Sequence, residues 1–118
     1  MKFLFIEYPK CTTCQKAKKW LLEHEIEFTD RHIVEQRPQE EELEKWIAKS
    51  RLPVKKFFNT SGILYKEMNL KEKLPQMTEE EQIRLLATNG MLVKRPLLIS
   101  DDSVLVGFRP DEWELKCR

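Results

Sequence analysis

Glycine and long apolar runs are both scarce in this chain of 118 residues, which holds three glycines. Collagen-like and low-complexity chains need far more glycine, so a globular fold is expected. No stretch approaches the roughly 20 apolar residues of a membrane-spanning helix. The apolar run near the N-terminus, residues 3–6, is too short for the apolar part of a signal peptide. These features favour a soluble cytoplasmic protein with no membrane partner.

A large excess of charge of one sign is also missing. The sequence has 21 Lys and Arg residues against 20 Asp and Glu residues, which gives a formal net charge of +1. Proteins that bind nucleic acid or acidic membranes through their overall field carry a clear excess of positive charge. We therefore expect no direct nucleic-acid partner, and any anion-binding site must be local.

Cysteine is rare as well, with Cys11, Cys14 and Cys117 alone. A chain of this size can bury a core of its own, so no disulfide scaffold is needed. In a reducing cytoplasm, a close pair of cysteines is typically catalytic, redox-sensing or metal-binding. A zinc site needs about four ligands, and His24, His32 and Cys117 have no paired ligand spacing, so no metal is predicted. Cys117 is expected to be a surface thiol, and the two histidines have no evident partner.

The patterning along the chain predicts one α/β domain spanning residues 1–118. Short apolar runs bounded by turn residues predict strands, at residues 2–7, 26–33, 97–100 and 104–108. Apolar spacing and capping residues predict helices, at residues 12–25, after an opening Pro38, at 55–62, at 64–74, from Thr78 to Asn89, and after an opening Pro110. The helices between residues 38 and 90 form one block between the two halves of a mixed sheet. No repeat or linker indicates a second domain.

The pair Cys11-Thr12-Thr13-Cys14 stands between the first strand and the first helix. In a strand-helix-strand setting, two cysteines at this spacing indicate a thiol redox motif of thioredoxin-like type. Free amides and partial positive charge at a helix N-terminus stabilise a thiolate, so Cys11 is predicted to be the attacking sulfur. Cys14, one turn into the helix, would resolve the mixed disulfide. A zinc site and a pair of inert buried cysteines are the alternatives.

Two arginines are candidates for an anion site around Cys11. Arg95 stands before Pro96 and the third strand. In a thioredoxin-like arrangement Pro96, with a cis peptide bond, lies against the Cys11 loop, and Arg95 could reach an anion bound there. Arg109, between the last strand and the last helix, could bind a tetrahedral oxyanion bidentately. The alternatives are a solvated arginine and a surface ion pair.

The polar turn Asn59-Thr60-Ser61-Gly62 is a further candidate. Short polar side chains and a glycine suit a turn rich in free amides near a ligand, and they suit an ordinary helix terminus equally well. The residues alone leave both interpretations open.

Four motifs in order carry a resemblance to a known family: Tyr8-Pro9-Lys10-Cys11-Thr12-Thr13-Cys14, Phe57-Phe58-Asn59-Thr60-Ser61-Gly62, Lys94-Arg95-Pro96 and Gly107-Phe108-Arg109-Pro110. With them the chain resembles the ArsC/Spx family over nearly its whole length, and it looks closest to bacterial ArsC-like proteins. The resemblance implies a thioredoxin-like, glutaredoxin-like fold, with a helical insertion between the second strand and the C-terminal hairpin.

The resemblance also implies roles for individual residues. Cys11 is the counterpart of the arsenate-attacking cysteine, and Arg95 and Arg109 match two oxyanion-binding arginines of the glutathione- and glutaredoxin-dependent arsenate reductases. Asn59 stands where those reductases have a third arginine, and they have no resolving cysteine at the position of Cys14.

The Cys pair is instead shared with Spx-type regulators, which resemble redox switches that bind the alpha subunit of RNA polymerase. Those regulators lack an arginine matching Arg109. The glycine that they use at the polymerase contact has no clear counterpart in residues 49–53 of this chain. The sequence therefore falls between the two groups.

The hypothesis favoured by the sequence is an arsenate reductase-like thiol oxidoreductase. Cys11 attacks a disulfide or a small oxyanion, Cys14 resolves the product, and Asn59, Arg95 and Arg109 bind substrate. No cofactor is expected to be bound, and the electrons come from thioredoxin, glutaredoxin or a glutathione-like thiol. The alternative is a redox-sensing transcriptional regulator that binds RNA polymerase.

Overall fold

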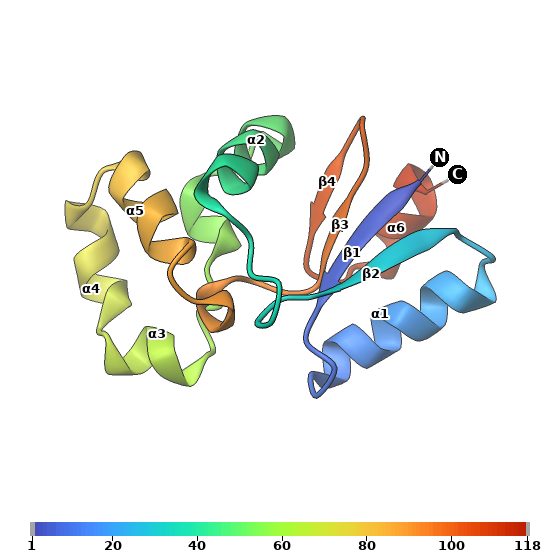
Figure 1. Cartoon of the computed structure of the whole chain (residues 1–118), viewed down its shortest axis with the longest axis horizontal. Coiled ribbons are helices and arrows are strands. Elements are labelled where there is room, and N and C mark those ends of the chain that lie inside the picture. The colour runs from blue at the N-terminus through green and yellow to red at the C-terminus, as the bar shows by residue number, and fades with distance from the viewer. Residues whose placement is uncertain (1, 118) are drawn as a thin grey trace.

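The structure, a computed structural model, describes residues 2–117 and is built on a four-stranded mixed sheet with the order β2-β1-β3-β4 (Figure 1). The central strand β1 (Phe3–Glu7) pairs in parallel with β2 (Phe28–His32) and antiparallel with β3 (Leu97–Ile99). The edge strand β4 (Val104–Val106) pairs antiparallel with β3. The predicted mixed sheet is therefore confirmed, and it places β1, from the N-terminal part of the chain, beside β3, from the C-terminal part.

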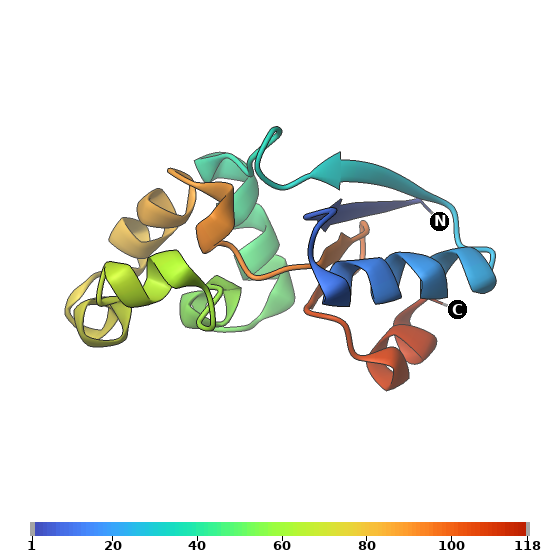
Figure 2. The same ribbon diagram turned by 90° about the horizontal axis from the view of Figure 1, so that it is seen from below.

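Side-chain alternation along β1 divides the core into two parts. Phe3 and Phe5 point to one face of the sheet, where they pack with α1 (Thr12–Glu23) and α6 (Pro110–Lys116). Ile6 points to the other face and joins the larger core shared with the helical block. Figure 2 shows α1 and α6 on the same side of the sheet, with the helical block at the other end of the molecule.

The helical block lies between β2 and β3, as predicted. It holds four α-helices and three single turns of 3₁₀ helix among the described residues: α2 (Glu40–Ser50), η1 (Val54–Phe57), α3 (Ile63–Glu67), α4 (Leu70–Lys73), η2 (Leu74–Gln76), α5 (Glu79–Leu86) and η3 (Gly90–Leu92). The guanidinium of Arg31 on β2 makes two hydrogen bonds, of 2.7 and 2.8 Å, to the Glu42 carboxylate on α2. This bidentate pair ties the block to the sheet.

Several predicted boundaries were wrong. The helix after Pro38 begins at Glu40, because Gln39 is its N-cap in a capping box with Glu42. The predicted helix over residues 55–62 is only the turn η1, since Phe58 is extended and bridges to Val93. The predicted helix over residues 64–74 is broken into α3 and α4 at Asn69, whose φ is 53°.

Both strands of the C-terminal hairpin are shorter than predicted. The Ser100 amide donates to the Ser103 carbonyl, which closes the turn and ends β3 one residue early. Gly107 has a φ of 78°, so β4 stops at Val106. The capping box of Thr78 with Glu81 is confirmed, and so is the start of the last helix at Pro110.

The return of the chain from the helical block to the sheet passes very close to β2. A Cβ atom built on Gly90 would lie 2.0 Å from the Ile33 carbonyl oxygen and 2.7 Å from its carbon. Because this neighbour is backbone, it cannot rotate away as a side chain could. Gly90 therefore fixes the position of the segment that continues to Lys94 and Arg95. Across residues 2–117, no helix has both the length and the apolar character needed to cross a membrane.

We expect Gly90→Ala to lower the free energy of unfolding by about 1–3 kcal/mol, the usual cost of forcing extra atoms into a packed site. Gly62→Ala is the matched control, because the atom closest to its new Cβ, at 2.8 Å, is the flexible Asn59 side-chain amide. Urea denaturation of both variants measures the difference. Equal stabilities would contradict the tight contact at Gly90.

Candidate active site

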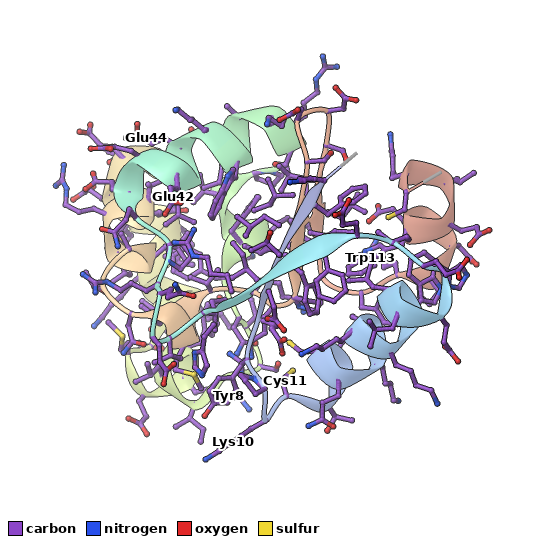
Figure 3. The ribbon with its side chains drawn as sticks, turned by 45° about the vertical axis from the view of Figure 1, so that its right-hand side comes forward. Tyr8, Lys10, Cys11, Glu42, Glu44 and Trp113 are labelled. Carbon is purple, nitrogen blue, oxygen red and sulfur yellow. The ribbon has the colours of Figure 1, made fainter. Side chains whose placement is uncertain are left out.

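Cys11 stands at the junction of the central strand and the first helix. After β1 the chain turns through Tyr8, whose carbonyl accepts a 2.9 Å hydrogen bond from the Cys11 amide. Cys11 is the N-cap of α1, with extended backbone angles, and its side chain is half-buried. Figure 3 shows Cys11 beside Tyr8 and Lys10 at this end of the sheet. The predicted position of Cys11 at a helix N-terminus is confirmed.

The two cysteines of the pair have opposite environments. Cys14 lies on the inner side of α1 and has no exposed surface. Burial alone would raise the pKa of the Cys11 thiol, but the Cys14 amide, the Cys14 thiol and the Arg95 guanidinium together lower it below its ordinary value. Burial raises the pKa of Cys14 to about 12, and the neighbouring Cys11 adds to the rise. Cys11 therefore forms a thiolate more readily than an ordinary cysteine, whereas Cys14 stays a thiol at neutral pH.

The thiols of Cys11, Cys14 and Cys117 are all free. A Cys11–Cys14 disulfide is therefore not part of this state of the protein, and its formation stays a prediction. Cys117 was expected at the surface, and this was wrong: it is half-buried against the α1–α6 core, and burial raises its pKa to about 11. That environment makes Cys117 a poor nucleophile.

Arg95 brings a positive group with one unpartnered nitrogen to Cys11. The Arg95–Pro96 peptide bond is cis, as expected, and the Arg95 guanidinium lies 5.1 Å from the centre of the Tyr8 ring. Its Nη1 atom is buried and has no hydrogen-bond partner among the described residues. A buried donor without a partner is costly, and a charged one more so. The position therefore suits an anion that would accept from Nη1 beside the Cys11 sulfur.

A cavity of about 560 Å³ opens beside Cys11. Its walls include all three of the predicted substrate-binding residues, Asn59, Arg95 and Arg109. Arg109 is exposed, whereas Pro96 is buried and is not among the residues that line the cavity. The structure thus brings Cys11 and the three polar candidates together from four separate segments. Their roles in binding stay predictions.

Other residues of the cavity were missed by the sequence analysis. Lys94 adds a second cation next to Arg95, and Met91, Leu64 and Phe108 give the cavity an apolar wall. Lys94 could have been found, because it directly precedes Arg95. Nothing in the sequence marked Met91 or Leu64, since they come from the helical block and only the tertiary fold brings them to Cys11.

A buried carboxylate close to the Cys pair was also missed. Glu7 is the last residue of β1, and 4% of its surface is exposed. Lys18, one turn beyond Cys14 on α1, lies 3.5 Å from Glu7 and 2.7 Å from Asp30 on β2. Burial, followed by the hydrogen bond and charge of Asp30, raises the pKa of Glu7 to about 7. The hydrogen bonds from Glu7 and Lys18 outweigh burial and lower the pKa of Asp30, so the pair shares one proton near neutral pH.

The histidines have partners that the sequence did not reveal. His24 stacks on Trp20, with ring centres 3.9 Å apart, and its Nε2 lies 3.4 Å from a Glu114 carboxylate oxygen. The His32 Nδ1 accepts hydrogen bonds from the amides of the two residues that follow Ile33. Within residues 2–117, no three His, Cys, Asp or Glu side chains are grouped as a metal site would need, and the absence of a metal stays a prediction.

Comparison with known proteins identifies the family. The sequence profile of the ArsC family matches residues 6–115. The chain belongs to the ArsC family. The predicted resemblance to the ArsC/Spx family is thus confirmed.

Curated relatives of this ArsC family member include the protein YusI and the regulator MgsR. YusI of Bacillus subtilis (strain 168) is 56% identical over 114 residues, which cover 97% of each chain. The regulatory protein MgsR of the same organism is 33% identical over 108 residues, which cover 92% of this chain and 84% of MgsR.

Solved structures confirm the fold. A putative ArsC family related protein from Bacteroides fragilis has a TM-score of 0.95 and 66% identity, and the match covers 98% of this chain and 97% of that one. A possible arsenate reductase from Streptococcus mutans UA159 has a TM-score of 0.87 and 38% identity, and the match covers 95% and 97% of the two chains. The thioredoxin-like α/β fold of this ArsC family member is therefore shown.

Reactivity should separate the two cysteines. We expect the alkylation rate of Cys11 to follow a thiolate pKa below about 8.5, so that the reaction stays fast as the pH falls toward neutrality. Cys11→Ser should abolish the fast phase. Arg95→Ala should raise this pKa, because a neighbouring positive charge that favours the thiolate is lost.

Iodoacetamide labelling against pH, followed by peptide mapping, measures these rates. Arg84→Ala, on the exposed side of α5, is the matched control and should leave the rate unchanged. If Cys14 were the faster-reacting thiol, the assignment of the two sulfurs would be reversed.

Glu7 should make stability depend on pH. Because the folded state raises the pKa of Glu7, the protonated form is favoured, and this contribution to stability is lost as the pH rises from 4.5 through about 7. The Gln side chain of Glu7→Gln cannot ionise. The free energy of unfolding of this variant, relative to that of the wild type, should therefore be higher above pH 7 than at pH 5, by on the order of 1–3 kcal/mol. Denaturation curves at pH 5 and pH 8 measure the gain, with the exposed Glu23→Gln as control. A constant difference between variant and wild type would contradict the shift.

Proposed function

We propose that this protein is a thiol–disulfide oxidoreductase of arsenate reductase type, working in the reducing cytoplasm. The observation that carries the proposal is the buried, unpartnered Nη1 of Arg95 beside a thiol of lowered pKa, in a cavity that Asn59 and Arg109 also line. A nucleophile and an anion-binding group at one opening suit attack on a substrate that carries negative charge.

With a disulfide substrate, the Cys11 thiolate attacks one sulfur and the other sulfur leaves as a thiolate that takes up a proton. Cys14 then gives up its proton and attacks the Cys11 sulfur. This step forms the Cys11–Cys14 disulfide and releases the second substrate thiol. The substrate gains two electrons and the Cys pair loses two.

With arsenate, Cys11 displaces one oxygen as water and forms an arsenic–sulfur bond. Attack by Cys14 on the Cys11 sulfur then leaves both electrons of that bond on arsenic, which departs as arsenite. In both cases the product is the same protein disulfide. An external dithiol or thiol, such as thioredoxin, glutaredoxin or a glutathione-like thiol, restores the two thiols. No bound cofactor is required by this cycle.

The raised pKa of Cys14 fits the order of these steps. A thiol with a pKa of about 12 stays protonated until its neighbour has reacted. Once the Cys11 sulfur is covalently bonded, its negative charge is gone, and one of the causes that hold the Cys14 proton is removed. The attack by Cys14 on the Cys11 sulfur is thereby delayed until the substrate is covalently bonded to Cys11.

A redox-sensing regulator is the second candidate. The 33% identity to the regulatory protein MgsR favours it, and so does the Cys pair that the resemblance matches to Spx-type regulators. In that role the Cys11–Cys14 disulfide would be a signal, and the partner would be the alpha subunit of RNA polymerase. Arg109, which Spx-type regulators lack, favours the enzyme.

Coupled turnover tests the proposal. Purified protein is supplied with reductant and with either arsenate or the neutral hydroxyethyl disulfide, and is compared with Cys11→Ser and Cys14→Ser. We expect Cys11→Ser to lose all activity, and Cys14→Ser to stop at a mixed adduct on Cys11 in a single turnover run without reductant. A pull-down with RNA polymerase is run beside it. If RNA polymerase were captured and neither substrate were turned over, the enzyme hypothesis would be rejected in favour of the regulator.

Anion binding should depend on the same arginine. Charge-assisted hydrogen bonds contribute about 1.5–3 kcal/mol each, so Arg95→Ala should weaken sulfate or arsenate binding by roughly tenfold or more. Calorimetric titration of the reduced protein measures this, with Arg84→Ala as the matched control. Equal binding by both variants would leave Arg95 without a role in anion recognition.

A further inference from the structure

A second, larger hollow lies along the free edge of the sheet. It is a groove of about 1080 Å³ between β4 on one side and the end of α2 on the other. Figure 1 shows β4 at the outer edge of the sheet, on the side of α2. We name it the β4 groove. It is separate from the Cys11 cavity but meets it, because Lys94, Val106 and Arg109 line both.

The β4 groove concentrates positive charge that the whole chain lacks. Seven of its lining side chains are Lys or Arg and two are acidic, although the net charge of the protein is only +1. Besides Lys94 and Arg109, the cations are Lys49, Arg51, Lys55, Lys56 and Lys116. None of these takes part in an ion pair between described residues. The local field therefore favours a partner with negative charge.

The backbone in the groove offers hydrogen bonds as well. Facing residues of an antiparallel pair alternate between exchanging hydrogen bonds and not exchanging them. The bonds from the Ser100 amide to Ser103 and from the Gly107 amide to Pro96 mark the exchanging positions of β3 and β4. The amide and carbonyl groups of Val104 and Val106 must therefore point away from β3, toward the groove. Among the described residues, no group bonds to them there.

An unpaired strand edge inside a basic groove fits one kind of occupant. An extended peptide can add to a sheet edge through its main chain, while pockets and charges beside the edge select its side chains. We propose that the β4 groove binds an extended acidic segment of a partner protein, which adds as a fifth strand to β4. A nucleic acid could meet the cations but has no amides to pair with Val104 and Val106.

The residues that line both the β4 groove and the Cys11 cavity lie at the end of the groove toward which the docked segment runs. A chain lying along β4 past Val106 reaches Lys94 and Arg109, and these border the opening at Cys11. The groove thus leads a partner to the cysteine, and it shares Arg109 with the proposed anion site. The proposal does not depend on the redox chemistry, because binding is measured with Cys11→Ser.

The probe is a fluorescent ten-residue peptide that alternates Glu and Val, bound to the Cys11→Ser protein at low salt. We expect binding that weakens as salt rises, and about tenfold weaker binding to a variant carrying Lys55→Glu and Lys56→Glu. The control variant carries Lys71→Glu and Lys73→Glu on α4, outside the groove, and should bind as the parent does. Circular dichroism checks that both variants are folded.

Strand addition has its own signature. We expect the bound peptide to slow hydrogen exchange at the Val104 and Val106 amides by about tenfold or more, because both become hydrogen-bonded. A peptide of the same sequence, N-methylated at alternate residues on its pairing edge, should lose binding. No binding, unchanged exchange at Val104 and Val106, or equal affinity for a single-stranded oligonucleotide of matched charge would each overturn the proposal.

Discussion

The contact of the Arg95 guanidinium with the Cys11 thiol depends on the pairing of β1 with β3, and the rest of the site is arranged around it. Cys11 follows β1, Arg95 precedes β3, and these strands are antiparallel, so the end of one lies beside the start of the other. More than eighty residues separate the two side chains, and only the sheet holds them together. A guanidinium placed this way lowers the pKa of the sulfur and leaves a buried Nη1 free, so one side chain both activates the nucleophile and offers a donor to its target.

Burial then separates the roles of the remaining titratable groups. Cys14 and Glu7 both lie on the α1 side of β1, with pKa values raised by burial to about 12 and about 7. Burial also acts on Cys11 at the N-cap, but the Cys14 amide and thiol and the Arg95 guanidinium together outweigh it. The junction of β1 and α1 thus provides a partly exposed position and a buried one within a single turn of helix. This contrast makes Cys11 reactive, while Cys14 stays protonated.

Most of the fold and part of the candidate site could be predicted from the sequence. Local signals were enough where one segment determines the outcome, as with Cys11 at the helix start, the capping box of Thr78 and the opening of the last helix at Pro110. They failed at Asn69, which takes a left-handed conformation inside residues 64–74, a stretch that otherwise favours helix. They also failed for Met91 and Glu7. Met91 reaches the cavity only through the docking of the helical block, and the protonation of Glu7 depends on Asp30 from another strand.

The short edge strand admits two explanations that differ in what the lysines do. Proteins often place lysine along a sheet edge to prevent pairing with another chain, and β4 is also short, which serves the same end. Such guards work by repelling a like-charged strand and by being costly to bury, so they exclude neutral and basic segments. They do not exclude an acidic segment, because each cation of the groove attracts its negative charges. The same residues that keep β4 from pairing at random would therefore make it selective, and the continuity with the Cys11 opening gives that selectivity a use in choosing which proteins reach the thiol.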